Sequence, residues 1–455
     1  MLPRLANLGI LHRRHLLFLA ASLTLAFCGC ARNRPYRTEL PRCCATPANQ
    51  SQACAIEKTT NYLLGIVEID DQGWLWNRQQ MDCVLDWIQH ADAQDNLGGL
   101  LIFVFVHGWQ HNAAYHDDYV KSFRNMLAGL DLIEHTTSKA NHLPARKIVG
   151  VYVGWRGLTD YIPYLQDLTF WGRKRTAHEV GRGGLTELFL RLEDFVNQTK
   201  RREGPGRAAS RLIIFGHSFG GAATYSALAP LLMERLIEPH PTGDDEGAPR
   251  DFGDLVILAN PAFEAARFEA LRDLATNVWS GAAAEVDRSR PPVNLVIFTS
   301  KSDAATRIAF PFGRVLATLF QSHRDGEQRH ANRTAVGHYK PFITHELVPL
   351  ATNKAQLANQ KTYGVETNAL LAANTVLRLQ SKMPKEKRPR APREVIDFSQ
   401  TRLSPVAPAT GHPFMVVAVS KKIIPDHSHV QKRLFVNFLD EFLMYMAPDK
   451  RKETP

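Results

Sequence analysis

The chain has 455 residues, of which 44% are hydrophobic and 22% charged, a composition typical of a large globular protein with one big domain or two. Its formal net charge is +10. The densest basic run, residues 382–393, is rich in proline and has no aromatic residue to stack on bases, so nothing in the chain resembles a nucleic-acid-binding module. We read that run as a solvated loop, with contact to anionic lipid headgroups as the alternative.

The first residues have the pattern of an export leader. Basic residues precede an apolar run, residues 16–27, which is too short for a stable membrane span. The run leads into Cys-Gly-Cys, and a glycine directly before Cys30 is typical of bacterial lipoprotein signals, in which the cysteine becomes the lipidated first residue. Phe27 stands where such signals favour leucine, and an ordinary secretory signal is the alternative. We expect removal of residues 1–29, export, and a lipid anchor on Cys30 that holds the protein at the bacterial cell membrane or outer membrane, facing the periplasm.

Cysteine usage agrees with export. After Cys30 the chain contains only Cys43, Cys44, Cys54 and Cys83. An oxidising compartment permits one or two disulfides among them, and their pairing stays open. A zinc site is less favoured, because there is no Cys-x-x-Cys and no histidine close by. Residues 30–60 show no apolar periodicity, and we read them as a tether.

From residue 61 onward, short apolar runs alternate with segments of helical periodicity. Runs with strand character are 62–69, 100–106, 147–153, 211–215, 254–260, 294–300 and 414–420. Apolar residues recur at helical spacing in 119–130, 185–196, 222–236 and 430–446. This alternation predicts an α/β domain over residues 61–447, with a mostly parallel sheet covered by helices on both faces. Such sheets carry their active sites beyond the carboxyl ends of the strands.

A Gly-x-Ser-x-Gly pattern, residues 216–220, lies between a predicted strand and a predicted helix. That is the context of a nucleophile elbow, a sharp turn in which flanking glycines leave room for the backbone. A structural turn or a phosphate-binding loop is the alternative, but the Gly-Lys-Ser/Thr ending of a phosphate loop is missing. We predict that Ser218 is a catalytic nucleophile.

The second motif is His107-Gly108-Trp109, at the end of strand 100–106. It resembles the oxyanion loop of lipases and esterases. On that reading the amide of Trp109 acts with the amide of Phe219, the residue after the nucleophile, to stabilise a developing oxyanion. We read His107 as a structural residue that orders this loop.

The acid and the base of such a site should follow later strands. Asp303 comes shortly after one strand and is placed to accept the histidine Nδ1–H and fix its tautomer. Glu264 is the alternative acid. His427 follows the last strand and precedes the closing helix, and we predict that it is the base, with His429 and His338 as alternatives.

The order Ser218, Asp303, His427 is that of the α/β-hydrolases, and over roughly residues 62–446 the chain resembles the serine esterases and lipases of this fold. The resemblance implies hydrolysis of carboxylic esters through a Ser-His-Asp triad and an acyl-enzyme, with lipid esters and thioesters among the candidates. It implies no cofactor and no metal. The partners it implies are a small-molecule or lipid ester and, through the anchor, a membrane.

One departure from the family pattern is a long insertion, residues 304–413, between the acid and the last strand. We leave open whether it is a lid, a partner surface or a partly disordered loop.

Two other functions are alternatives. A non-catalytic, membrane-anchored scaffold with a hydrolase fold would have no chemical reason to keep serine, aspartate and histidine in register. A metallohydrolase would use His107, His111, His116 and Asp117, but this segment lacks the His-Glu-x-x-His spacing.

Overall fold

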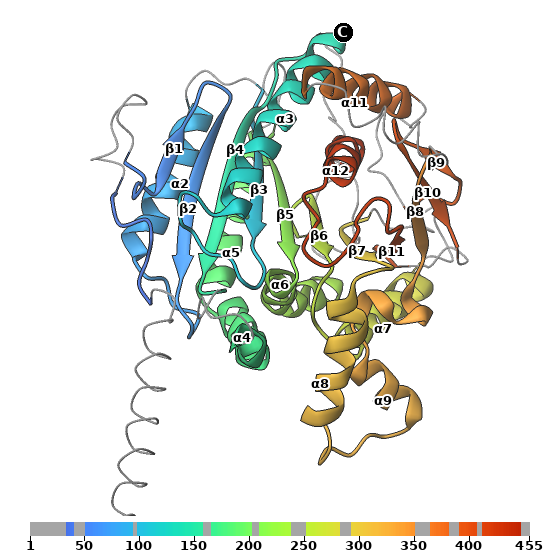
Figure 1. The fold of residues 1–455 in the computed structure, drawn as a ribbon. Coiled ribbons are helices and arrows are strands. Elements are labelled where there is room, and N and C mark those ends of the chain that lie inside the picture. Colours follow the sequence, from blue (N-terminus) through green and yellow to red (C-terminus); the bar gives the residue numbers. More distant parts are fainter. Residues whose placement is uncertain are drawn as a thin grey trace, which may run out of the picture.

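The protein is described from a computed structural model that covers residues 33–40, 51–93, 98–157, 165–202, 209–237, 252–282, 293–350, 365–381, 391–406 and 412–446. Within these residues eleven strands form one sheet in the order β1-β2-β4-β3-β5-β6-β7-β11-β8-β10-β9 (Figure 1). The strands are β1 (Ile56–Lys58), β2 (Tyr62–Ile69), β3 (Leu100–Val106), β4 (Lys147–Trp155), β5 (Arg211–His217), β6 (Leu255–Ala259), β7 (Leu295–Ser300), β8 (His345–Pro349), β9 (Ile396–Asp397), β10 (Thr401–Pro405) and β11 (Phe414–Val419). Neighbours from β2 across to β8 are parallel, and β1, β10 and β9 pair antiparallel at the two edges.

Helices cover both faces of this sheet (Figure 1). One face carries α2 (Arg78–Ala93), α4 (Leu165–Arg182), α5 (Gly184–Arg201), α6 (Phe219–Ile237) and α7 (Ala265–Ala282). The other face carries α3 (Asp118–Ala140), α11 (Val365–Gln380) and α12 (Arg433–Met446). The predicted α/β class, a mostly parallel sheet with helices on both faces, is confirmed. The seven predicted strands are all present, with ends that differ from the prediction by two residues at most.

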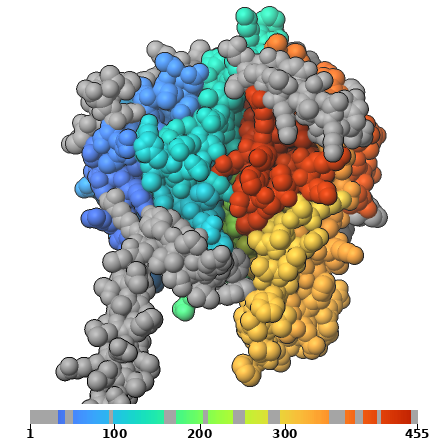
Figure 2. Space-filling model, in the orientation of Figure 1, coloured from blue at the N-terminus to red at the C-terminus, as the bar shows by residue number. Residues whose placement is uncertain are grey.

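A lobe projects from the body of the molecule beyond α7 (Figures 1 and 2). We use the term lobe for residues 305–333, which comprise a π-helical turn, η3 (Ala305–Ala309), and the helices α8 (Phe310–Ala317) and α9 (Gly326–Arg333). Two 3₁₀ turns, η4 (Val336–His338) and η5 (Lys340–Phe342), lead from the lobe back to β8.

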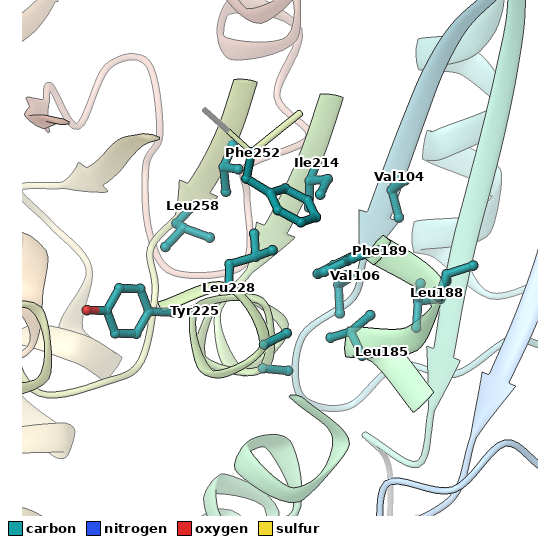
Figure 3. Packing of buried hydrophobic residues seen from close by; sticks show 14 of the residues in the cluster. Val104, Val106, Leu185, Leu188, Phe189, Ile214, Tyr225, Leu228, Phe252 and Leu258 are labelled. Atoms are coloured by element: carbon teal, nitrogen blue, oxygen red, sulfur yellow. The ribbon is translucent and has the colours of Figure 1, made fainter. Parts of the chain in front are cut away.

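The inner strands are apolar on both sides because each side faces a helical layer. Along β3, Leu100, Ile102, Val104 and Val106 belong to the core beneath α5 and α6, and Leu101, Phe103 and Phe105 belong to the core beneath α3 and α12. This alternation follows from the period of two along a strand. Figure 3 shows the first core, where Val104 and Val106 of β3 lie near Leu185, Leu188 and Phe189 of α5.

The prediction that residues 30–60 form a tether is wrong for the residues of this range that the structure describes. Arg37 is buried, and its guanidinium pairs with Glu57 and donates to the carbonyl oxygens of Cys54 and Ala113. The backbone N–H of Arg37 donates to the carboxylate of Glu68, 2.7 Å away. A buried carboxylate at the end of β2 needs such donors, and the N-terminal segment supplies them. Residues 33–40 and 51–60 are therefore packed on the domain, and β1 is a strand of its sheet.

The insertion at residues 304–413 builds a large part of the domain. It contributes the lobe, helix α11, and the strands β8, β10 and β9 that extend the sheet beyond β11. Helix α11 packs on the same face of the sheet as α3 and α12.

Several predictions fall outside the described residues: the leader at 1–29, Cys30, Cys43, Cys44, and most of the basic run at 382–393. Cys54 takes part in a disulfide. Among the helices that are described, none combines the length and the hydrophobicity needed to cross a bilayer.

Candidate active site

Ser218 sits in a strained turn between β5 and α6. Its φ is +55°, a left-handed conformation that is rare for residues other than glycine. The turn is fixed by its backbone, since the Ser218 N–H donates to the Ala259 carbonyl and the Ser218 carbonyl accepts from the Ala222 N–H. Gly220 is required here, because a Cβ would lie 2.2 Å from the carbonyl oxygen of Val106. The structure thus places a serine at a sharp strand-to-helix turn at the carboxyl end of a central strand.

Three of the predicted site residues form one hydrogen-bonded chain. Ser218 Oγ lies 2.6 Å from His427 Nε2, and His427 Nδ1 lies 2.8 Å from Asp303 Oδ2. In the tautomer that fits both contacts, the serine hydroxyl donates to Nε2 and Nδ1–H donates to the carboxylate. Ser218 is 3% exposed and Asp303 is fully buried, whereas the His427 side chain keeps 17% of its surface exposed.

The carboxylate of Asp303 is held by further donors. The backbone N–H and the hydroxyl of Thr306 both donate to it, and the Nε2–H of His338 donates in turn to the Thr306 hydroxyl. Burial raises the pKa of Asp303, but the nearby His427 and the hydrogen bonds from His427 and Thr306 outweigh burial and hold the pKa below its ordinary value. Asp303 is therefore an ionised acceptor in the neutral pH range.

The loop that carries His427 is held at five consecutive backbone carbonyls. Side-chain donors reach the carbonyl oxygens of residues 424–428, with distances between 2.6 and 3.3 Å. The donors are Ser300, Ser302, Asn260, His217 and Tyr119. The imidazole is thus positioned by a scaffold drawn from the ends of β5, β6 and β7 and from α3.

His217, the residue before Ser218, belongs to that scaffold. Its Nε2–H donates to the His427 carbonyl, 2.9 Å away, and its Nδ1 faces the Tyr119 hydroxyl at 3.1 Å. Burial and the neighbouring His427 lower the pKa of His217 to about 3. It is therefore a neutral structural group at physiological pH.

The loop after β3 lies directly against Ser218. A Cβ on Gly108 would stand 2.8 Å from Ser218 Cβ and 2.8 Å from His217 Nδ1. His107 orders this loop: its Nε2 accepts the N–H of Trp155, its Nδ1–H donates to the Gly108 carbonyl, and burial lowers its pKa to about 4. Trp109 is partly buried against the core, and Phe219 is the first residue of α6.

The residues considered as the alternative base or acid form no hydrogen bond with Ser218. His429 is about half exposed, and its Nδ1 lies 2.6 Å from Asp426. His338 is behind Asp303, on the Thr306 hydroxyl. Glu264 is buried in an ion cluster with Lys174, Arg314 and Arg267. Burial raises the pKa of Glu264, but Lys174 and Arg314 outweigh it and hold the pKa at about 2.

The histidines considered for a metal site are engaged locally. His111 lies 3.2 Å from Asp117 and stacks on Tyr119. Within the described part of the chain, no three histidine, cysteine, aspartate or glutamate side chains gather as metal ligands would.

The sequence analysis did not identify several residues that hold the site in place, above all Asn260 and Thr306. Asn260 ends the run 254–260 with a φ of +45°, and its Oδ1 accepts the Ser300 N–H. A polar residue directly after a buried strand was the available signal for Asn260. Thr306 lies three residues after Asp303, the spacing at which a first-turn residue can donate back to the acid.

Comparisons with known proteins add little to this geometry. The chain matches no family model, and no curated protein matches it. It is similar to the solved structure of the siderophore hydrolase EstB from Aspergillus nidulans, with 12% identity, 77% of this chain and 83% of that chain covered, and a TM-score of 0.27. It is also similar to an uncharacterised protein from Pseudomonas aeruginosa, with 12% identity, 49% and 38% covered, and a TM-score of 0.18. Likeness at this level says nothing about the reaction.

Proposed function

We propose that the protein is a serine hydrolase that cleaves carboxylic esters at Ser218. The observation that carries the proposal is the chain of two short hydrogen bonds, from Ser218 Oγ to His427 Nε2 and from His427 Nδ1 to Asp303 Oδ2. A serine activated by a base that a third group orients is the general arrangement of nucleophilic acyl transfer.

In the proposed reaction, Ser218 Oγ attacks the ester carbonyl carbon while His427 Nε2 takes the hydroxyl proton. His427 then gives that proton to the departing alcohol, which leaves an acyl-enzyme on Ser218. Water, deprotonated by the same nitrogen, attacks the acyl carbonyl, and the proton returns to Ser218 as the acid product leaves. Asp303 stays ionised, fixes the Nδ1–H tautomer and stabilises the imidazolium. None of these steps uses a cofactor.

The amides of Trp109 and Phe219 are the proposed oxyanion donors. Two observations support this assignment: Gly108 brings the backbone of its loop within contact distance of Ser218, and Phe219 opens α6. Helix N-termini carry partial positive charge, which favours an anion at that position. One such donor is commonly worth about 10²–10³ in rate.

Labelling with a fluorophosphonate probe tests the nucleophile. We expect one adduct on the full chain, at Ser218, and none on Ser218→Ala. The absence of an adduct on the folded wild-type chain would favour the non-catalytic scaffold instead.

The base is tested with a pair of histidine variants. His427→Ala should lower turnover of p-nitrophenyl acetate by about 10⁴-fold or more. His429→Ala is the matched control and should keep most of the activity, because its imidazole pairs with Asp426 at a half-exposed position. The reverse result would move the base to His429.

The class of substrate follows from the serine nucleophile only in part. We propose a carboxylic ester, with lipid esters and thioesters as the other candidates, since a serine nucleophile serves all of them. Rates for p-nitrophenyl esters of graded chain length, compared with an acyl thioester of the same chain, would rank them.

We also propose export and a lipid anchor on Cys30. The leader pattern supports this, and so does the disulfide at Cys54, because disulfides persist in oxidising compartments. In a bacterial host, palmitate labelling should mark the wild-type chain and not Cys30→Ser. A chain that stays unlabelled but still sediments with membranes after washing would contradict the lipid anchor.

A further inference from the structure

The lobe presents an apolar face to solvent that runs from η3 along α8 into the turn that follows it. Its large hydrophobic side chains fall at helical spacing, and five of them are between 37% and 69% exposed while the sixth is fully exposed. They are Ile308, Phe312, Val315, Leu316, Leu319 and Phe320. We call these six residues the lobe face. Soluble proteins rarely leave so many large apolar groups together in solvent, and such patches mark interaction sites.

The opposite side of the same helix is firmly attached to the domain. Phe310 is buried and lies beneath the ammonium of Lys174, with 5.5 Å from Nζ to the ring centroid. Arg314 lies 3.0 Å from the buried carboxylate of Glu264. The helix is therefore held with its apolar side outward.

The lobe carries an excess of positive charge. Residues 305–333 contain five arginines against one aspartate and one glutamate. Arg314 faces Glu264 and Arg324 pairs with Asp325, whereas Arg307 and Arg329 are exposed. Exposed phenylalanine and leucine side chains with exposed arginines nearby are typical of a segment that lies in a membrane interface. Anionic lipid headgroups would complement this charge.

The shape of the lobe also fits a membrane. The lobe is a convex projection from the body of the molecule (Figure 2). A protein partner would need a matching concave surface, whereas a bilayer accommodates a convex apolar helix by inserting it to a depth of about 5–10 Å.

The lobe lies at the end of the molecule where the proposed anchor begins. Asn33 is three residues after Cys30 and lies beside Ile69 and Trp155, the last residues of β2 and β4. The lobe follows β7 at its carboxyl end, and β2, β4 and β7 run in the same direction (Figure 1). A bilayer that held a lipid on Cys30 would therefore face the lobe and the carboxyl edge of the sheet.

From these observations we propose that the lobe face docks on a phospholipid membrane surface and inserts its apolar side chains, with a preference for anionic lipid. The docking is independent of the reaction at Ser218. It orients the carboxyl edge of the sheet, where Ser218 lies, toward the membrane.

The first test measures amide hydrogen exchange of the full chain carrying Cys30→Ser, with and without vesicles of phosphatidylcholine and phosphatidylglycerol at 3:1. Peptides that cover residues 305–322 should exchange at least several-fold more slowly with vesicles, and peptides of α12 should not change. The exchange of that segment reports its own contact with lipid, whatever else in the chain binds. Unchanged exchange in 305–322, or no binding to vesicles at all, would overturn the proposal.

The second test replaces apolar residues of the lobe face with aspartate. In the same background, the triple variant Phe312→Asp, Leu316→Asp, Phe320→Asp should bind these vesicles at least tenfold more weakly, because burial of one such side chain is worth about tenfold or more in affinity. The matched control is Ile237→Asp, Leu370→Asp, Val395→Asp, three residues of comparable exposure on other surfaces, and it should bind like the parent. Circular dichroism and hydrolysis of the soluble p-nitrophenyl acetate confirm that each variant is folded.

Three further outcomes decide the matter. Ser218→Ala should bind vesicles like the parent, so docking can hold even if the hydrolase proposal fails. Vesicles of phosphatidylcholine alone should bind more weakly than anionic ones, and equal binding would contradict the part assigned to charge. If the triple variant binds vesicles normally but loses a dimer seen by sedimentation velocity in the parent, the lobe face is a contact between two copies and the proposal is wrong.

Discussion

Substitution of Asn260 tests whether its hydrogen bonds hold the loop that carries His427 in place. Its Nδ2 donates to the His427 carbonyl at 2.9 Å and more weakly to the Asp426 carbonyl at 3.3 Å, and its Oδ1 accepts the buried Ser300 N–H at 2.9 Å. Because Asn260 has a φ of +45°, Asn260→Gly removes these bonds without adding backbone strain. Each short bond contributes about 1 kcal/mol, and an unsatisfied buried amide costs about 1–3 kcal/mol, so we expect a total loss of about 2–5 kcal/mol of stability.

Only part of that loss acts on the loop that carries His427, since other donors still hold it. A shift of about 1.4 kcal/mol toward unproductive loop positions would lower kcat about tenfold. KM for a short ester should change less than twofold, because Asn260 contacts the catalytic loop and the loss falls on the transition state. Steady-state kinetics with p-nitrophenyl acetate and the rate of fluorophosphonate labelling measure both quantities.

Asn260→Asp is the informative partner variant. It keeps the acceptor for Ser300 but turns a carboxylate oxygen toward the carbonyls of Asp426 and His427, which repels them instead of binding them. We expect a larger loss of kcat than for Asn260→Gly. If both variants keep kcat within twofold while their stability falls, Asn260 is a packing residue and our account of the loop is refuted.

Three other predictions follow from the same site. Gly108→Ala places a Cβ 2.8 Å from Ser218 Cβ, so kcat should fall at least tenfold while circular dichroism stays unchanged; full activity would show that the loop moves aside freely. Thr306→Val removes the hydroxyl that donates to Asp303, so we expect the free energy of unfolding to fall by about 1.5–3 kcal/mol and kcat to fall about tenfold. The control Thr306→Ser keeps the hydroxyl and should retain both the stability and kcat. Equal stability and kcat in the two variants would argue against a role for this hydrogen bond. His107 and His217 have pKa values of about 4 and about 3 in the folded chain, below the ordinary value near 6.5 of the unfolded chain. The unfolded chain therefore binds more protons as the pH falls below 6.5, and stability that is present above that pH should decrease by about 2 kcal/mol per histidine by pH 5. Urea unfolding of His217→Gln should show a smaller slope against pH, and an unchanged slope would exclude this cause.

The inner sheet was predictable from the sequence because its strands are buried on both faces and read as continuous apolar runs. Strands β8, β9 and β10 were missed for the opposite reason. They form the end of the sheet beyond β11, where β8 and β10 alternate buried with more exposed residues and β9 has only two residues. In β10, for example, Thr401 and Leu403 are buried and Arg402 is exposed. Short mixed strands of this kind look like loop in a single sequence.

The location of the three central site residues was predictable because each follows a strand that the sequence marks clearly. The groups that hold them were not, since Asn260, Thr306 and Tyr119 come from three separate segments that only the fold brings together. The prediction of a tether at residues 30–60 was wrong for the same reason, because the partners of this polar segment are brought to it only by the fold. The guanidinium of Arg37 pairs with the buried Glu57, and the backbone N–H of Arg37 donates to the buried Glu68.

The position of β11 has a consequence for the order in which the molecule can be completed. β11 pairs with β7 on one side and with β8 on the other, and both precede it in the chain. It is therefore the last of the inner strands to be synthesised, and its place in the sheet lies between two strands that precede it in the chain. His427, the proposed base, follows β11 in the chain, so Ser218 lacks this partner until β11 has been synthesised. On the proposed function, a chain that ends before β11 would carry the turn with Ser218 but would be inactive, because it lacks the strand that leads to His427.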